Sequence, residues 1–172
     1  LTGADTILPH EAALAAEPGP GPNPEGGLLA VVDGRRRVSA WAGLRDAGHW
    51  SGVLGLHASA AGPAGETADH EELVVGTEER VDLAAALDLL AERGVRTVRV
   101  DSGGALGGAM LDRGLVDEVS LLVHPVLSDG AKRWQGTAAG TRELELIASQ
   151  VFDDGVVWLR YRVGKGGPAA QG

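Results

Sequence analysis

Alternating helical and β-branched segments in the second half of the chain constrain the fold more than any other feature of the sequence. Asp82 is a favourable N-cap for a helix over Leu83–Glu92, whose leucines recur at helical spacing, and Val95–Val100 follows as a β-branched strand. A glycine pair then leads into a second helix and a second strand, predicted at Ala105–Arg113 and Val119–His124. This order implies a right-handed crossover between parallel strands, and therefore an α/β fold.

The remaining apolar segments add further strands. Arg142–Val151 and Val156–Val163 are predicted to form an antiparallel hairpin, because Asp153-Asp154-Gly155 between them is a favourable turn. Asp33-Gly34 is a second turn signal, so Arg37–Trp41 is predicted to pair back on the strand before it. We expect a mixed, mostly parallel sheet flanked by helices, with a C-terminal antiparallel hairpin. The other short strands are predicted at Leu28–Asp33, Val53–His57 and Leu73–Val75.

The length of 172 residues is that of one domain with a core of its own, so we expect a single domain over residues 1–172. Pro18–Gly27 and Ala58–Glu71 are rich in glycine, proline or charge and are predicted to be irregular. Neither divides the chain into parts that are large enough to fold alone. Gly164–Gly172 is predicted to be a flexible tail.

Charge and composition exclude several classes of function. The net charge of −9 argues against a general nucleic-acid binder or a protein of anionic membrane surfaces. The sequence has no cysteine, which excludes disulfides, thiolate nucleophiles and zinc–thiolate sites. No apolar run is long enough to span a bilayer, and Leu1–Leu8 lacks the features of a signal peptide. The absence of cysteine does not fix the compartment but fits a cytoplasmic protein, which we expect.

The segment Asp101–Leu106 is the strongest candidate for a binding site. It follows a predicted parallel strand, contains two glycines and opens a helix, so backbone N–H groups can meet an anion such as a phosphate. A plain tight turn is the alternative that this pattern leaves open. The Asp-Ser-Gly-Gly letters do not indicate a serine protease, because their flanks are a strand and a helix rather than an all-β fold.

The same region resembles a known family. The matching residues are Asp101, Ser102-Gly103-Gly104, Leu106-Gly107-Gly108, Gly114-Leu115-Val116-Asp117-Glu118 and His124-Pro125. Together they resemble the C-terminal half of the riboflavin-biosynthesis reductase domain, the dihydrofolate-reductase-like domain of the bifunctional deaminase–reductase. Gly3–Leu8 also resembles the G-A-D-x-x-L strand of that family.

The resemblance implies a three-layer dihydrofolate-reductase-like fold and an oxidoreductase that uses NADPH. The substrate would be of the 5-amino-6-ribosylaminopyrimidine phosphate type, and hydride transfer would convert its ribosyl group into a ribityl chain. Five residues would lie against the diphosphate of the cofactor, and Asp101 would position the substrate or relay a proton. Members are often homodimers, and the hairpin Arg142–Val163 is a candidate interface. The five cofactor residues are Ser102, Gly103, Gly104, Ala105 and Leu106.

This sequence also departs from the family pattern. The family has a strand before its G-A-D segment, and this chain begins after that point, so the domain is predicted to lack an N-terminal strand. Pro9–Ala13 stands where the family has a glycine-led turn, and Gly107 replaces an asparagine. The alternative function is therefore that of a diverged, non-catalytic relative acting as a binding or oligomerisation module.

The five histidines do not suggest a metal. No two of them share metal-ligand spacing on one predicted element, so no metal site is predicted. His57 ends a strand at the expected ligand edge and is therefore a candidate cofactor contact. Arg35-Arg36-Arg37 follows a predicted turn and is either a phosphate contact or a solvated basic turn.

Overall fold

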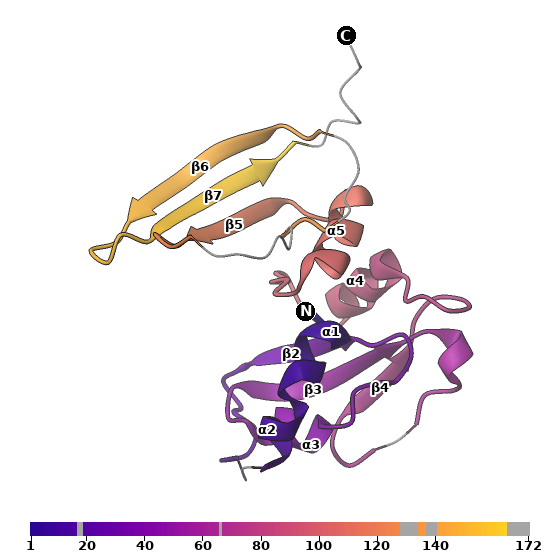
Figure 1. Cartoon of the computed structure of the whole chain (residues 1–172). Helices are drawn as coiled ribbons and strands as arrows, with labels where there is room; N and C mark the ends of the chain where they lie inside the picture. The colour runs from indigo at the N-terminus through magenta and orange to yellow at the C-terminus, as the bar shows by residue number, and fades with distance from the viewer. Residues whose placement is uncertain (17–18, 66, 128–133, 137–140, 165–172) are drawn as a thin grey trace. The chain divides into compact units, whose positions relative to one another are not determined.

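The computed structural model describes residues 1–16, 19–65, 67–127, 134–136 and 141–164. The predicted tail lies outside these residues except for Gly164. The chain groups into two compact units, Leu1–Leu106 and Gly107–Gly172, and each is described by itself (Figure 1). No helix among the described residues is long and apolar enough to cross a bilayer.

A four-stranded parallel sheet is the centre of the first unit. Its order is β1 (Thr2–Gly3), β2 (Gly27–Val32), β3 (Trp50–His57) and β4 (Glu71–Val74). Consecutive residues in the second halves of β2 and β3 are buried, so both faces of the sheet are covered there.

Helices cover both faces of this sheet. On one face, α1 (Ala4–Ile7), α2 (Glu11–Ala16) and α3 (Trp41–Asp46) contribute Ala4, Leu14, Trp41 and Leu44 to a cluster that also contains Leu29, Val31 and Val53. Figure 1 shows α1 and α2 in front of β2 and β3. The helix α4 (Leu83–Glu92) has the predicted bounds, and the Asp82 carboxylate accepts hydrogen bonds from the N–H groups of Ala84 and Ala85 at 3.0 and 3.1 Å. Two 3-10 turns, Leu8–His10 and Ser59–Ala61, complete the unit.

A three-stranded antiparallel sheet forms the second unit. The strands of this sheet are β5 (Glu118–Val123), β6 (Leu144–Val151) and β7 (Val157–Val163), with β7 in the middle. The helix α5 (Gly104–Asp112) precedes β5 in the chain. The predicted β6–β7 hairpin is confirmed. Its turn is closed by hydrogen bonds from Phe152 N to Val156 O and from Gly155 N to Phe152 O, both 2.9 Å long, and Gly155 has a φ of 82°.

Two strand predictions are wrong. Arg37–Trp41 does not pair back on β2, because both edges of β2 are already paired, with β1 and with β3. Val95–Val100 is not a regular strand either, although two backbone hydrogen bonds join its end to Leu1: from Leu1 N to Arg99 O at 2.6 Å and from Asp101 N to Leu1 O at 3.0 Å. The expected parallel pairing of Val119–His124 is also wrong, since β5 is antiparallel to β7. The α/β class, with a parallel sheet flanked by helices and a C-terminal antiparallel hairpin, is confirmed.

Candidate active site

The segment after Arg99 reaches the carboxyl end of β1. The Ser102 hydroxyl accepts a hydrogen bond from Gly3 N at 3.2 Å and lies 3.4 Å from the hydroxyl of Thr6 in α1. A Cβ atom on Gly3 would lie 3.1 Å from that hydroxyl, so the close approach depends on a glycine at this position. The structure thus ties the segment to the β1–α1 junction.

The main chain at Gly103 is exposed to solvent. A Cβ atom built on this residue would meet no atom within 4 Å outside its two chain neighbours. The helix α5 begins at the next residue, Gly104, and has nine residues. The first N–H groups of a helix lack intrahelical partners, so the N–H groups at this bend can donate hydrogen bonds to an anion.

Asp101 stands at the start of this bend with its side chain in solvent. The carboxyl group is 79% exposed and forms an ion pair with Arg99 at 3.2 Å, whose side chain is 87% exposed. A carboxylate in this position is able to accept hydrogen bonds from a ligand hydroxyl or amine.

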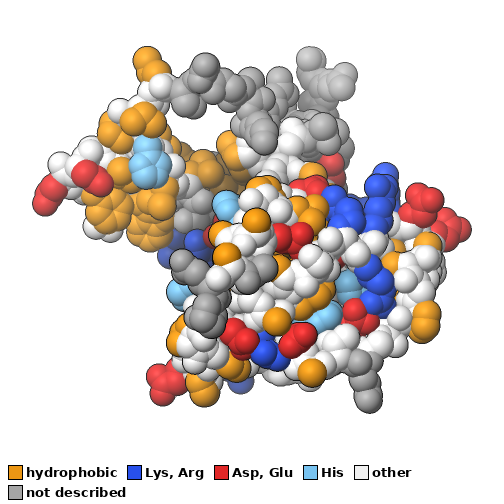
Figure 2. Space-filling model, turned by 60° about the horizontal axis from the view of Figure 1, so that its bottom comes forward, with side chains coloured by type: hydrophobic (Ala, Val, Ile, Leu, Met, Phe, Trp, Pro, Cys, Tyr) orange, Lys and Arg blue, Asp and Glu red, His pale blue; other side chains and the backbone are white. Residues whose placement is uncertain are grey.

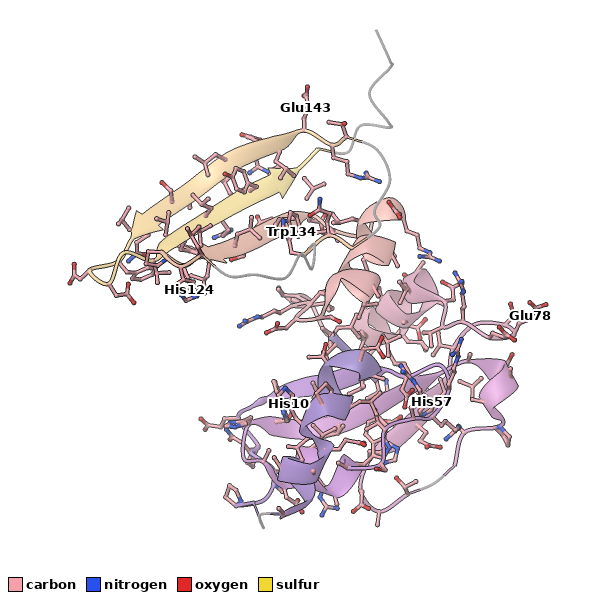
Figure 3. The ribbon with its side chains drawn as sticks, in the orientation of Figure 1. His10, His57, Glu78, His124, Trp134 and Glu143 are labelled. Atoms are coloured by element: carbon pink, nitrogen blue, oxygen red, sulfur yellow. The ribbon has the colours of Figure 1, made fainter. Side chains whose placement is uncertain are left out.

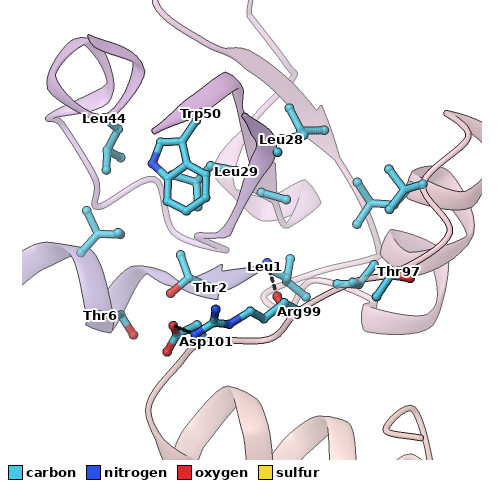
Figure 4. Close-up of a pocket in the computed structure, with 16 residues that line it drawn as sticks. Leu1, Thr2, Thr6, Leu28, Leu29, Leu44, Trp50, Thr97, Arg99 and Asp101 are labelled. Atoms are coloured by element: carbon cyan, nitrogen blue, oxygen red, sulfur yellow. Dashed lines mark hydrogen bonds and ion pairs between the residues drawn. The ribbon is translucent and has the colours of Figure 1, made fainter. Parts of the chain in front are cut away.

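A cavity of about 610 Å³ lies beside this segment (Figure 4). Leu28, Leu29 and Trp50 contribute apolar walls, while Thr6 and Asp101 line the polar side. The cavity follows Gly27–Ala30, the part of β2 that the two-residue β1 does not pair with. Ligands of parallel sheets bind at the carboxyl ends of the strands. We therefore centre the candidate active site on Asp101–Leu106, which shares Asp101 with the lining of this cavity.

His57 lies in the interior of the first unit. Its side chain is 1% exposed, and its Nδ1 atom is 2.7 Å from the main-chain oxygen of Asp33 (Figure 3). Its Nε2 atom points to Glu72, with the Glu72 Oε1 atom 3.6 Å away. The ring therefore takes part in a buried polar cluster and does not present an edge to solvent.

Two arginines of the triplet Arg35-Arg36-Arg37 form ion pairs with acidic side chains. Arg36 forms an ion pair with Glu72, and Arg37 donates to Asp5 at 2.8 Å. Burial works to raise the pKa of Glu72, but hydrogen bonds from Arg36 and from the Gly65 N–H lower it to about 2. Both arginines thus have structural partners, while Arg35 is exposed.

The fold brings together residues that the sequence did not connect. Thr6 joins Ser102 from a segment almost one hundred residues away. His70 and Glu72 join His57, although they come from the segment predicted to be irregular and from the start of β4. No spacing along one element signals this group, because its members come from separate parts of the parallel sheet.

Comparison with known proteins gives a consistent result. Residues 1–158 match the family described as the RibD C-terminal domain. The chain is 33% identical over 140 residues to the 2,5-diamino-6-ribosylamino-4(3H)-pyrimidinone 5′-phosphate reductase of Archaeoglobus fulgidus, covering 76% of this chain and 63% of that protein. It is 30% identical over 135 residues to the reductase of the same name from Methanothermobacter thermautotrophicus, covering 76% and 60%. The chain therefore spans about three fifths of the length of these curated relatives.

Solved structures are similar in fold. A pyrimidine reductase-like protein from Corynebacterium diphtheriae has a TM-score of 0.69 at 16% identity, covering 96% of this chain and 75% of that one. RibD from Acinetobacter baumannii has a TM-score of 0.65 at 18% identity, covering 95% of this chain and 46% of that one. At these identities, the likeness establishes the fold alone.

Proposed function

The chain belongs to the RibD C-terminal domain family, and we propose that it is an NADPH-dependent reductase acting on a phosphorylated ribosylaminopyrimidine. Two curated relatives carry the name of a reductase with a ribosylaminopyrimidinone 5′-phosphate substrate, which supports this class of substrate. The observation that carries the proposal is the bend Ser102–Gly104 at the carboxyl end of β1. It combines an anchored serine, an exposed glycine and a helix start.

The residues of this bend fit a nucleotide diphosphate. A Cβ atom built on Gly103 would meet no atom within 4 Å outside its two chain neighbours, so a phosphate could approach the main chain from that side. The binding groups would be the backbone N–H groups of Ser102–Leu106, and small side chains suffice because they only have to leave room. His57 was a further candidate for this contact, but its buried ring makes it a weaker proposal than the bend.

NADPH would supply the hydride, and the chain would orient the reactants. The role proposed for Asp101 is to accept a hydrogen bond from a substrate hydroxyl or amine and so to orient the ribosyl group. Because its carboxyl group is open to solvent, the proton that completes the reduction can come from water. The proposal also places the reaction in the cytoplasm, in keeping with a sequence without cysteine.

The test is a titration of the protein with NADPH, followed by quenching of tryptophan fluorescence, with NADH in a parallel titration. We expect saturable binding that Gly103→Val weakens at least about tenfold, since the added side chain fills the space a phosphate would use. Gly164→Val is the matched control, because its Cβ would make only an ordinary contact, 3.4 Å from Glu143 O. If the folded protein does not bind NADPH, the chain is a non-catalytic relative that acts as a binding or oligomerisation module.

We further propose that the protein is a homodimer that uses the antiparallel sheet. Leu144 and Leu146 of β6 lie opposite Val163 and Tyr161 of β7, on one face of this sheet, and are 38% and 53% exposed. Light scattering coupled to size-exclusion chromatography is expected to give twice the monomer mass for the natural chain and the monomer mass for Leu146→Glu. A monomeric natural chain would contradict this part of the proposal.

A further inference from the structure

A group of two imidazoles and one carboxylate lies on the face of the parallel sheet covered by α3. We call it the His57–His70–Glu72 cluster. Gly55 of β3 pairs with Glu72 of β4, and His57 is two residues further along β3, so the three side-chain positions share one face. A Cβ atom on Gly55 would lie 2.7 Å from His57 Nε2, so the absence of a side chain there makes room for the ring. Trp41 of α3 covers the cluster, with its ring stacked on His70 at 4.0 Å.

The hydrogen bond to Asp33 determines the tautomer of His57. Its Nδ1 atom is 2.7 Å from the main-chain oxygen of Asp33, and a carbonyl oxygen only accepts. Nδ1 therefore carries a proton, and in the neutral ring Nε2 has a free lone pair. This Nε2 atom is buried and has no hydrogen-bond partner. An unpartnered buried nitrogen is rare enough in folded proteins to require an explanation.

Thr67 determines the tautomer of His70 in the same way. The Thr67 hydroxyl lies 2.5 Å from the main-chain oxygen of His70, to which it must donate its one proton, and 2.9 Å from His70 Nδ1. Nδ1 is therefore the donor to the hydroxyl oxygen, so Nε2, at hydrogen-bond distance from Glu72 Oε1 (3.3 Å), has a free lone pair when the ring is neutral and a proton only when the ring is positively charged.

Both lone pairs point to the same carboxylate. Glu72 Oε1 lies 3.3 Å from His70 Nε2 and 3.6 Å from His57 Nε2, and all three atoms lie within 4.8 Å of one another. With both rings neutral, three electron-rich atoms at these distances repel one another unless a proton or a metal ion lies between them. Arg36 is the nearest cation; it donates to Glu72 Oε1 and to the main-chain oxygens of Ala61 and Pro63. A carboxylate oxygen has two lone pairs, so Oε1 retains one beside Arg36.

We propose that the His57–His70–Glu72 cluster binds a divalent transition metal ion of the zinc type. Zinc takes imidazole nitrogens and carboxylate oxygens at about 2.0–2.2 Å, which separates neighbouring tetrahedral ligands by about 3.3 Å. Two of the ligand separations here are 3.3 and 3.6 Å. The Nδ1 atoms of the two rings are hydrogen-bonded to the Asp33 carbonyl and the Thr67 hydroxyl. Hydrogen bonds of this kind, from the nitrogen that does not bind the metal, orient metal-binding histidines. Solvent would complete the coordination.

The site would hold the loop before β4 against the sheet. His57 ends β3, His70 immediately precedes β4 and Glu72 lies within β4, so one ion would join both ends of the connection. This role does not depend on NADPH binding or on the proposed reduction. The two proposals therefore fail separately.

The test is titration of the metal-free protein with Zn²⁺ by calorimetry, together with visible absorption of the Co²⁺ form. We expect one ion per chain, a Co²⁺ spectrum of low-coordinate nitrogen and oxygen ligands, and a melting temperature that rises with Zn²⁺ and falls again with EDTA. His70→Phe keeps the aromatic ring on Trp41 and removes the ligand atom. Glu72→Gln keeps the shape and the acceptor for the Gly65 N–H. Each is expected to weaken Zn²⁺ binding at least about a hundredfold.

Two further variants complete the test. His10→Ala removes an exposed histidine (Figure 3) and is expected to bind Zn²⁺ like the natural chain. Thr67→Val keeps all three ligand atoms and removes the outer hydrogen bond of the His70 ring, together with the hydroxyl's hydrogen bonds to the His70 main chain. It is expected to weaken binding about tenfold, a readout that remains if a ligand variant does not fold. The proposal is overturned if the natural chain binds no stoichiometric ion, or if the ligand variants and Thr67→Val bind Zn²⁺ as tightly as His10→Ala.

Discussion

The two sheets of this protein differ in how completely their side chains are buried. In the parallel sheet, the run Val53–His57 is buried at every position, because helices cover both faces. Among the described residues of the antiparallel sheet, Val119 and Val163 are buried, in a small cluster with Leu111 of α5 that Val116 and Leu121 pack against. The described strands of the second unit are therefore less completely buried than β3 of the first unit.

The second sheet has two different faces. On one, Glu118 pairs with Arg160 at 2.8 Å and Glu145 with Arg162 at 2.7 Å. The other face carries apolar residues, including the half-exposed Leu146. Figure 2 shows hydrophobic side chains gathered on this unit, whereas acidic and basic side chains are interspersed over the first. A closed core can hold a buried polar cluster in place, and an open apolar face is suited to contact with a partner.

Truncation of one leucine in each sheet should show the largest contrast. Leu56 in β3 is 0% exposed, so Leu56→Ala should lower the free energy of unfolding by about 2–5 kcal/mol. Leu146 in β6 is 53% exposed, so Leu146→Ala should change it by only about 0.5 kcal/mol. Urea denaturation followed by tryptophan fluorescence measures both. Equal losses would show that the second sheet is as completely buried as the first.

The two inner glycines of β3 offer a sharper comparison within the first unit. A Cβ atom on Gly55 would meet His57 Nε2 at 2.7 Å and the Trp41 ring at 3.3 Å, so Gly55→Ala should cost about 1–3 kcal/mol and displace the His57 ring. Gly52→Ala is the matched control, because its nearest contact would be Leu28 Cδ1 at 3.6 Å. The same denaturation experiment applies. A Gly55→Ala protein as stable as Gly52→Ala would mean that the ring has room to move.

Glu11 provides a pH-dependent contribution to the first unit. Its Oε1 atom accepts hydrogen bonds from Ser39 N at 2.6 Å and Ala40 N at 3.2 Å, at the start of α3. The hydrogen bond from Ser39 lowers the pKa of Glu11, while burial opposes the shift. Since the folded-state pKa is the lower one, this stabilisation is present above the unfolded value, about 4.3, and is lost as pH falls through the folded value.

The variant Glu11→Gln should therefore lose about 1 kcal/mol at neutral pH, in the range of helix capping. The difference between this variant and the natural chain should shrink as the pH is lowered below about 4. Denaturation curves at a series of pH values check this. A difference that grows in acid would contradict the assigned direction of the pKa shift.

The smallest effect is expected on the charged face of the second sheet. Arg162 and Glu145 form an ion pair at 2.7 Å, but their side chains are 56% and 66% exposed. Arg162→Ala should change the free energy of unfolding by about 0.5 kcal/mol or less, because solvent screens such pairs. A double-mutant cycle with Glu145→Ala gives the pair energy directly. A value well above 1 kcal/mol would mean that this face is covered in solution.

Much of the local structure was predictable from the sequence, because its signals are short-range. Asp82 and the leucine spacing predicted α4 with its observed bounds, and Asp153-Asp154-Gly155 predicted the β6–β7 hairpin. The resemblance around Asp101–Leu106 predicted the family to which the chain belongs. The helix predicted after the two glycines is observed as α5, whereas the strand predicted before them is not. These features depend on residues within a few positions of one another.

Propensity and periodicity act along the chain, so the α/β class, the helix α4, the turn between β6 and β7 and the family could be predicted from the sequence. The partners of each strand edge and of each buried polar atom depend instead on the tertiary structure. Residues 37–40 lost their predicted pairing because β1 and β3 occupy both edges of β2. His57, His70 and Glu72 meet because the β3–β4 register and the missing side chain of Gly55 bring them to one face. Such meetings depend on register and on excluded volume, which spacing along one element does not encode.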